Sequence, residues 1–322
     1  MFTRQELEDA TRRVHSAMPP TPQYAWPTLS DRIGAEVWVK HENHTPTGAF
    51  KIRGGITFID WLTRTKPACP GIITATRGNH GQSQARAARA AGLRAVVYAP
   101  LGNAIEKNLA MRAFGAELVE FGSDFDEARI EAFRVGAEQG LETVPPFHKE
   151  LVRGVATYAY ELFTAAPDLD VVYVPIGCGS GICGTIAARD ALGLSTKVVA
   201  VVGEGAQTAR LSVEAGRPVE TDLPRTFADG MAVRMTVPEA MEIYSAGADH
   251  FVTVSDDEIA EAIRIYFHDT HNVAEGAGAA PLAALIQERE MWSGRKAGVI
   301  LCGGNIDTAW MAQILSGKTP SV

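Results

Sequence analysis

Long apolar runs are missing from this sequence of 322 residues. No stretch approaches the ~20 consecutive apolar residues that a membrane-spanning helix needs, which argues against a helical membrane protein. The first residues, MFTRQELEDATRRVHS, mix both signs of charge and contain no apolar core, so we expect no signal peptide. Internal repeats and Ser/Pro-rich linkers are also lacking. These absences leave a globular protein without a membrane partner.

An excess of basic residues is missing as well. The chain has 30 Lys and Arg residues against 38 Asp and Glu residues, a formal net charge of −8 at pH 7. This balance argues against nucleic acid or an anionic membrane surface as the partner and leaves a small molecule. The four cysteines form neither a CxxC pair nor a zinc-ligand pattern. We therefore expect no zinc site and a reducing, cytoplasmic location.

What the sequence does contain is an alternation of short β-branched runs and Ala-rich amphipathic segments. The predicted strands are residues 35–40, 71–76, 93–100, 116–122, 171–177, 197–203 and 297–304. The predicted helices are residues 81–92, 104–115, 124–140, 150–163, 181–193 and 256–270. Alternation of this kind predicts an α/β fold in which mostly parallel, twisted sheets are flanked by helices. Ligands of such sheets bind beyond the carboxyl ends of the strands.

Two proline-containing loops, residues 66–70 and 143–149, are the best candidates for lobe boundaries because proline cannot continue a helix. They divide the chain into a larger lobe, residues 1–67 and 149–322, and a smaller lobe, residues 68–148.

One lysine has unusual neighbours. In PTGAFKIRGG (residues 46–55), Lys51 lies between Phe50 and Ile52, among small and apolar residues. A surface lysine at the start of a helix is one interpretation. The other is an amine that is kept out of water because it takes part in chemistry.

The predicted strand 171–177 runs into GCGSGICG and then a helix. Glycine-rich turns at a helix N-terminus present several N–H groups to one anion. A phosphate would fit against Gly177, Cys178, Gly179, Ser180 and Gly181. The alternative is a tight turn without a ligand, since such turns are common. The spacing differs from that of nucleoside-triphosphate-binding loops, which favours a small phosphorylated cofactor.

Two further strand ends carry polar residues. TRGNHGQS (residues 76–83) follows the predicted strand 71–76, and LCGGNID (residues 301–307) ends the last predicted strand. Taken alone, Thr76 or Asn79 could cap a helix and His80 could be a structural histidine. Cys302 could be inert packing. The four motifs together are far more specific than any one of them.

In this combination the sequence resembles the pyridoxal-phosphate enzymes of fold type II, the group of threonine dehydratase, serine dehydratase and serine racemase. The resemblance extends from about residue 19 to residue 315. TGAFKIRGG resembles the lysine motif of the group, and TRGNHGQS its asparagine loop. GCGSG resembles the phosphate cup, with Cys178 and Ser180 replacing glycines, and LCGGN resembles the segment that faces the pyridine nitrogen. FADGMAVR (residues 227–234) and VAEGAGAAPLAAL (residues 273–285) also fit.

The resemblance implies a role for each of these positions. Lys51 would form a Schiff base with pyridoxal 5'-phosphate and, once displaced, remove the α-proton of the substrate. Asn79 would contact the 3-hydroxyl of the cofactor, and Cys302 would face its pyridine nitrogen. The other cofactor-binding residues would be Phe50, Gly177, Cys178, Gly179, Ser180 and Gly181. The substrate-binding residues would be Thr76, Arg77, Gly78 and His80.

A thiol at the pyridine nitrogen cannot act as a full charge partner, so the cofactor ring is a weaker electron sink and a long-lived carbanion is disfavoured. Such a site suits elimination. We therefore expect a dehydratase that converts a β-hydroxy-α-amino acid such as threonine, serine or 3-hydroxyaspartate into a 2-oxo acid and ammonia. The alternatives are a dehydratase for a bulkier substrate such as phenylserine, a β-replacement synthase, or a binding protein that has lost turnover. Retention of Lys51, Asn79 and Cys302 argues against the last.

Two departures from the group refine this expectation. Arg77 occupies the position of the serine that racemases use as a second base, and a guanidinium cannot accept a proton at neutral pH. Arg77 could instead bind a second substrate carboxylate, or turn outward, or pair with an acidic residue. Metal-activated relatives carry carboxylates where this chain has Val202 and Thr208. Glu204 alone would be a poor ligand set, so we expect no metal site there.

The resemblance also implies a homodimer, a larger lobe that binds the cofactor and a smaller lobe that moves. The chain stops soon after LCGGNID, where biosynthetic threonine dehydratases continue into a regulatory domain. We therefore expect a role in amino-acid catabolism.

Overall fold

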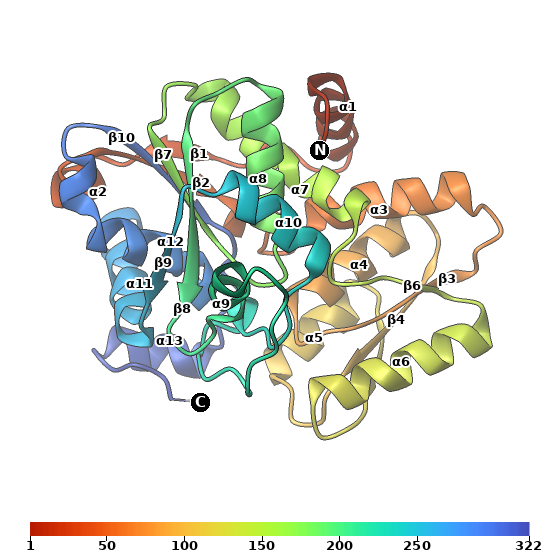
Figure 1. The fold of residues 1–322 in the computed structure, drawn as a ribbon. Coiled ribbons are helices and arrows are strands. Elements are labelled where there is room, and N and C mark those ends of the chain that lie inside the picture. The colour runs from red at the N-terminus through yellow and green to blue at the C-terminus, as the bar shows by residue number, and fades with distance from the viewer. Residues whose placement is uncertain (322) are drawn as a thin grey trace.

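Two sheets organise the computed structural model, which describes residues 1–321 (Figure 1). The larger sheet has the strand order β1-β2-β10-β7-β8-β9 and the smaller one the order β5-β4-β3-β6. All pairings are parallel except that of β1 with β2. Helices α8 and α12 pack on the larger sheet, and α4 and α6 on the smaller one. This arrangement confirms the predicted α/β class.

The strands are β1 (Gln23–Ala25), β2 (Glu36–His41), β3 (Gly71–Ala75), β4 (Arg94–Ala99), β5 (Glu117–Glu120), β6 (Glu142–Thr143), β7 (Val171–Pro175), β8 (Lys197–Gly203), β9 (His250–Val254) and β10 (Lys296–Leu301). The α-helices are α1 (Arg4–His15), α2 (Pro27–Ile33), α3 (Lys51–Thr65), α4 (Asn79–Ala90), α5 (Ile105–Ala113), α6 (Phe125–Gln139), α7 (Lys149–Ala165), α8 (Ser180–Ala191), α9 (Thr208–Ala215), α10 (Pro238–Gly247), α11 (Asp256–Thr270), α12 (Gly276–Gln287) and α13 (Thr308–Leu315). Short 3-10 helices are η1 (Glu42–His44), η2 (Asp229–Met231) and η3 (Arg289–Trp292).

The order of the strands brings three of the sequence motifs together. β2, β10 and β7 are neighbours in the larger sheet, and all three run in the same direction. The lysine motif follows β2, LCGGN ends β10, and the glycine-rich turn follows β7. The carboxyl ends of parallel strands meet at one edge of a sheet, so these three segments lie side by side.

Helix α3 joins the two sheets through a pair of glycines. A Cβ atom on Gly54 would lie 2.7 Å from the carbonyl oxygen of Leu151 in α7, and one on Gly55 would lie 2.5 Å from Ser83 Oγ in α4. Ser83 Oγ also donates a hydrogen bond of 2.7 Å to the carbonyl of Lys51. The two glycines therefore let α3 approach α7 and α4 more closely than a larger residue would allow.

A buried ionic cluster anchors the same helix. Arg53 is fully buried and donates to Glu42 (2.7 Å) and to Glu161 (2.6 Å). Lys40 Nζ also bonds to Glu161, at 2.5 Å. Although burial would raise it, the charges of Arg53 and Lys40 hold the pKa of Glu161 at about 2. The cluster connects the first turn of α3 to β2 and α7, and so fixes the position of Lys51 two residues away.

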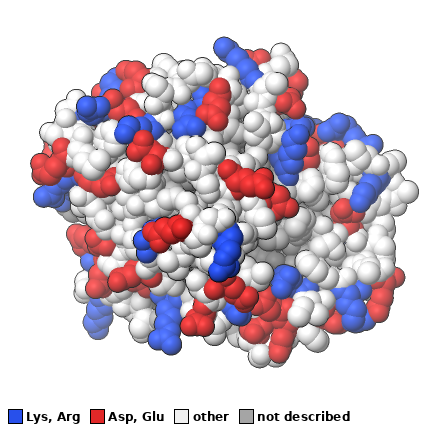
Figure 2. Space-filling model, in the orientation of Figure 1, with Lys and Arg blue, Asp and Glu red and all other residues white. Residues whose placement is uncertain are grey.

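The surface of the protein is mixed in charge. Acidic and basic side chains intersperse over the face in Figure 2. Among residues 1–321, no helix is both long and apolar enough to cross a membrane.

Replacing Arg53 by alanine should strongly destabilise the protein. The variant would leave Glu42 buried without its ion-pair partner, which costs about 3–5 kcal/mol. Urea unfolding followed by circular dichroism measures the loss. Arg64→Ala, which breaks an exposed pair with Asp60 on the same helix, is the matched control and should cost less than about 1 kcal/mol. Equal losses in the two variants would contradict the anchoring role of Arg53.

Candidate active site

Lys51 is the first residue of α3 and is half-buried. Its Nζ lies 5.0 Å from the centroid of the Phe50 ring and has no hydrogen-bond or carboxylate partner among residues 1–321. The preceding loop is fixed to the end of β10, because Phe50 N donates to the Cys302 carbonyl (2.9 Å) and Ala49 bridges to Gly303. The amine thus ends a rigid loop and remains available for chemistry.

An anion cradle lies beside this lysine, between β7 and α8. None of the backbone N–H groups of residues 177–182 has an acceptor in the described part of the chain. Gly179 has a left-handed φ of +95°, and a Cβ atom on Gly177 would lie 2.1 Å from the carbonyl oxygen of Gly230. Unpaired N–H groups at a helix N-terminus favour a phosphate. The residues predicted to form a phosphate cup therefore have the free donors that such a group would need.

Two thiols face this region from different strand ends. Burial raises the pKa of the Cys302 thiol well above its usual value and also raises the pKa of Cys178, while the charge of Lys51 opposes both shifts. Both side chains are therefore neutral thiols at pH 7. Cys302 can offer a hydrogen bond to a ring nitrogen but no negative charge.

A second set of free donors lies at the N-terminus of α4. The N–H groups of residues 79–81 have no acceptor within residues 1–321. Thr76 Oγ accepts a hydrogen bond from the N–H of Gly78 (3.1 Å). Gly78 is the N-cap residue and no side chain caps the helix, so neither Thr76 nor Asn79 has that role. Arg77 is exposed, and its carbonyl accepts from Asn103 Nδ2 (3.1 Å). This helix end can hold a carboxylate close to the lysine.

The side chain of Asn79 is held by two residues whose importance the sequence did not reveal. Asn79 Nδ2 donates to both carboxyl oxygens of Glu275, at 2.9 and 3.1 Å. Its Oδ1 accepts a hydrogen bond of 2.8 Å from Asn305 Nδ2. Both partners lie in quoted motifs, VAEGAGAAPLAAL and LCGGNID, but nothing in the sequence pairs them with Asn79.

His80 is buried and its Nε2 has no partner among the described residues. Burial, followed by the charge of Lys51, lowers the pKa of His80 to about 3. The ring is therefore neutral at physiological pH. The ring bonds to the Val144 backbone, so His80 is a structural histidine that is satisfied at one nitrogen and, within residues 1–321, free at the other.

Lys107 reaches from α5, beside the smaller sheet, to Asp229 in η2, beside the larger one. Although burial would lower it, Asp229 raises the pKa of Lys107. The pair connects the two halves of the molecule next to the asparagine loop, since the Lys107 side chain also packs 3.1 Å from a Cβ atom built on Gly78.

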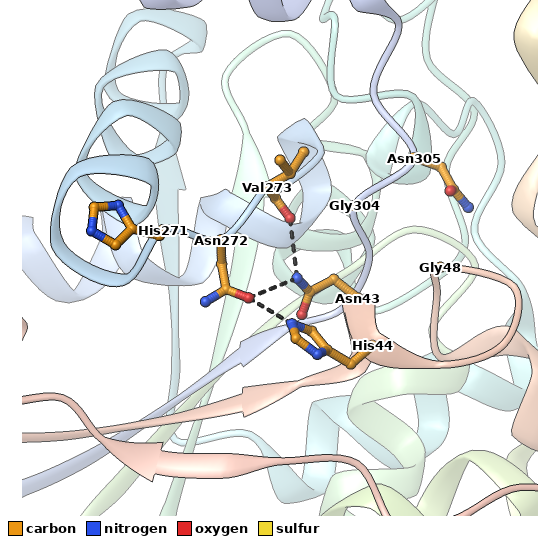
Figure 3. Close-up of a pocket in the computed structure, with 8 residues that line it drawn as sticks. All are labelled: Asn43, His44, Gly48, His271, Asn272, Val273, Gly304 and Asn305. Carbon is orange, nitrogen blue, oxygen red and sulfur yellow. Dashed lines mark hydrogen bonds between the residues drawn. The ribbon is translucent and has the colours of Figure 1, made fainter.

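Figure 3 shows a separate pocket of about 430 Å³ behind the 302–305 segment. There Asn43 Nδ2 donates to the Asn272 side chain and to the Val273 carbonyl, both at 3.2 Å. Asn305 points away from this pair in Figure 3. The pocket shares Asn305 with the active-site region but contains neither Lys51 nor the anion cradle.

No group of three or more His, Cys, Asp or Glu side chains suited to a metal ion occurs within residues 1–321. Glu204, the acidic residue that this chain keeps where metal-activated relatives carry carboxylates, lines a pocket together with Arg225, Asp256 and Asp257.

The fold and the site define a two-sheet α/β enzyme in which a shielded lysine faces an anion cradle. The sequence matches the family described as pyridoxal-phosphate dependent enzyme over residues 14–303. The chain belongs to this family, which confirms the resemblance and pyridoxal phosphate as the cofactor.

Several relatives resemble the chain over nearly its whole length. An L-threonine ammonia-lyase of Thermotoga maritima is 32% identical over 98% of this chain and 79% of its own. An L-threo-3-hydroxyaspartate ammonia-lyase of Saccharomyces cerevisiae is 29% identical over 97% of this chain and 96% of its own. Among solved structures, maize serine racemase superposes with a TM-score of 0.91 at 25% identity, covering 98% of this chain and 97% of the racemase.

The burial of His80 predicts a loss of stability in mild acid. In the unfolded chain this ring is protonated below pH 6.5. In the folded chain its pKa is about 3, so it stays neutral between pH 6.5 and pH 3. Stability therefore falls as the pH decreases from 6.5 towards 3, by about 1.4 kcal/mol per pH unit for this group. Urea unfolding of wild type and His80→Gln at pH 7, 6 and 5 measures the difference. Parallel pH dependences in the two proteins would refute the assignment.

Proposed function

We propose that the protein is a pyridoxal-phosphate-dependent dehydratase, which converts a β-hydroxy-α-amino acid into a 2-oxo acid and ammonia by α,β-elimination. The observation that carries this proposal is the convergence of Lys51, the N–H groups of residues 177–182 and the neutral Cys302 thiol at neighbouring strand ends. Relatives named threonine ammonia-lyase and 3-hydroxyaspartate ammonia-lyase support it.

The bound cofactor would supply the electron sink for carbon–hydrogen bond breakage. The chain's own residues do the rest. The cradle at residues 177–182 would hold the phosphate, and the Cys302 thiol would meet the ring nitrogen without adding charge. The N–H groups of residues 79–81 orient the substrate carboxylate, and Lys51 Nζ accepts the α-proton as a general base. Phe50 shields that amine on one side.

Elimination is favoured over racemisation by Arg77. A racemase needs a proton acceptor on the second face of the substrate, and a guanidinium cannot fill that role. The likeness to maize serine racemase therefore concerns the fold and the cofactor.

Ammonia release from a panel of threonine, serine, 3-hydroxyaspartate and phenylserine tests the proposal. We expect turnover of at least one substrate, and a loss of at least about 10³-fold in kcat for Lys51→Ala, because both cofactor attachment and the general base are removed. Addition of EDTA should change the rate less than twofold. Full activity of Lys51→Ala would refute the mechanism. Product formation only with an added thiol would indicate a β-replacement synthase instead.

We further propose that Arg77 binds a second carboxylate, which would make 3-hydroxyaspartate the preferred substrate. Its guanidinium is exposed, contacts no carboxylate within residues 1–321, and belongs to the loop that precedes the α4 donors. The neighbouring cation, Lys107, is already paired with Asp229. Arg77 is therefore a free positive charge, outside the lysine and the α4 donors, that an additional carboxylate could pair with.

Arg77→Gln should lower kcat/KM for 3-hydroxyaspartate by about 10- to 100-fold, the effect of losing a charged hydrogen-bond partner. Threonine turnover should change less than about threefold, because threonine has no second carboxylate. Steady-state kinetics of both proteins with both substrates provide the comparison. A wild-type preference for threonine would end the dicarboxylate hypothesis while leaving the dehydratase intact.

We also propose that the protein acts in the cytoplasm as a homodimer, in which residues 68–148 move as a smaller lobe. The four free cysteines suit a reducing compartment. The four-stranded sheet lies within residues 68–148, and the Lys107–Asp229 pair connects that segment to the rest of the chain.

A further inference from the structure

Four groups form one continuous chain of hydrogen bonds beside the lysine loop. Asn305 Nδ2 donates to the carbonyl of Thr47 and to Asn79 Oδ1, both at 2.8 Å. Asn79 Nδ2 in turn donates to Glu275. The four residues come from the lysine motif, the end of β10, the start of α4 and the start of α12.

The direction of these bonds is determined from both ends. The Thr47 carbonyl can only accept, so Asn305 must present its NH₂ group there. The same NH₂ group faces Asn79, which must therefore present its oxygen. The NH₂ group of Asn79 is then left to face Glu275, whose carboxylate accepts. Neither amide can rotate by 180° without placing two acceptors or two donors against each other.

The carboxyl group of Glu275 is held tightly in this position. Glu275 is buried, and its N–H donates to the Gly303 carbonyl at 3.0 Å. A Cβ atom on Gly303 would lie 2.6 Å from Glu275 Oε1, so only glycine leaves room for the carboxyl group there. Gly48 does the same for Asn305, because its Cβ atom would lie 2.5 Å from Asn305 Oδ1.

This arrangement decides what Asn79 can offer to a ligand. Its oxygen is occupied by Asn305, and the two oxygens of Glu275 share its amide nitrogen. Both acceptors belong to one carboxyl group, so a single N–H group can serve them as a three-centre bond, and the second N–H group can then donate outward. Burial raises the pKa of Glu275, while the hydrogen bond from Asn79 lowers it. A donor of this kind suits a phenolic oxygen, and the carboxyl oxygens that accept from the same amide polarise it and strengthen that donation.

We propose that Glu275 and Asn305 are positioning residues, which together fix the Asn79 amide so that an N–H group meets the 3-hydroxyl of the cofactor. The inference rests on the proposed function, in which Asn79 contacts that hydroxyl. It adds two residues to the site whose effect passes through Asn79 alone.

If Glu275 had only a structural role, its substitution would lower the stability of the protein without affecting the cofactor, and a control variant is needed to tell the two roles apart. Glu275 immediately precedes α12, and Glu288 immediately follows it. Glu288 is also a partly buried acid, bonded to the Tyr173 hydroxyl (2.5 Å) and to His250 (2.8 Å). Glu288→Gln is therefore a matched control, which perturbs the same helix at its other end.

The experiment uses two substitutions of nearly unchanged shape, Glu275→Gln and Asn305→Asp. The first replaces the carboxyl group by an amide, which puts an NH₂ group where one of the two acceptor oxygens faces Asn79, and the second places an acceptor against both Thr47 and Asn79. Each purified protein is stripped of cofactor and titrated with pyridoxal 5'-phosphate, without substrate. The dissociation constant and the visible absorbance maximum of the bound cofactor are recorded, together with the melting temperature of the stripped protein.

We expect each substitution to weaken cofactor binding about tenfold or more, the usual effect of leaving a buried hydrogen-bonding group without its partner. The absorbance maximum should shift towards that of Asn79→Ala. In the Asn79→Ala background, Glu275→Gln should have no further effect on affinity or absorbance, because the group through which it acts is gone. Glu288→Gln should lower the melting temperature and leave the cofactor unaffected.

Unchanged affinity and absorbance in both Glu275→Gln and Asn305→Asp would overturn the proposal. So would an equal loss from Glu275→Gln with and without Asn79, since the effect would not pass through the amide. Because these measurements use no substrate, they are independent of the ammonia-release panel that tests the dehydratase reaction.

Discussion

The active site depends on the attachment of the lysine loop to the end of β10. Two main-chain contacts make this attachment, the Phe50–Cys302 hydrogen bond and the Ala49–Gly303 bridge. They exist because β2 and β10 are adjacent parallel strands, so that the segments leaving both strands emerge at the same edge. Because main-chain bonds hold the loop, the Lys51 side chain is not needed to fix it. The amine can therefore remain without a partner that would compete with a ligand.

Charge is distributed unevenly around this loop. The ion pairs of Arg53 with Glu42 and Glu161 are buried behind the first turn of α3, where they hold this helix in place. The groups that would touch a cofactor are different in kind: unpaired N–H groups, neutral thiols and an amide. Dipoles of this kind bind a phosphate or a carboxylate without adding a countercharge beside the lysine. Within residues 1–321, Glu275 is the one acidic side chain bonded to this set, and it contacts the Asn79 amide, whereas burial raises its pKa.

The sequence predicted the parts of the molecule that local patterns determine. All seven predicted strands are present, because buried parallel strands are apolar runs, and the glycine-rich turns stand at the strand ends where they were expected. It missed β1 and β6, which are too short to show a period, and β9, which lies at an edge of the larger sheet. Contacts between residues that are distant in the sequence could not be predicted from local patterns. Asn79 and Glu275 are 196 positions apart, and no local pattern pairs one buried amide with one buried acid.

The same limit applies to the two glycines of the lysine motif, because no local pattern shows which helices they contact. Gly54 faces α7, on the side of the larger sheet, and Gly55 faces α4, on the side of the smaller one. Helix α3 is therefore in close contact with both halves, and Lys51 begins it. Ser83 bonds the Lys51 carbonyl from α4, the helix whose N-terminus carries the free N–H groups for a carboxylate. The main chain of the lysine is thus bonded to α4 on one side, while Arg53 and β10 hold it from the other.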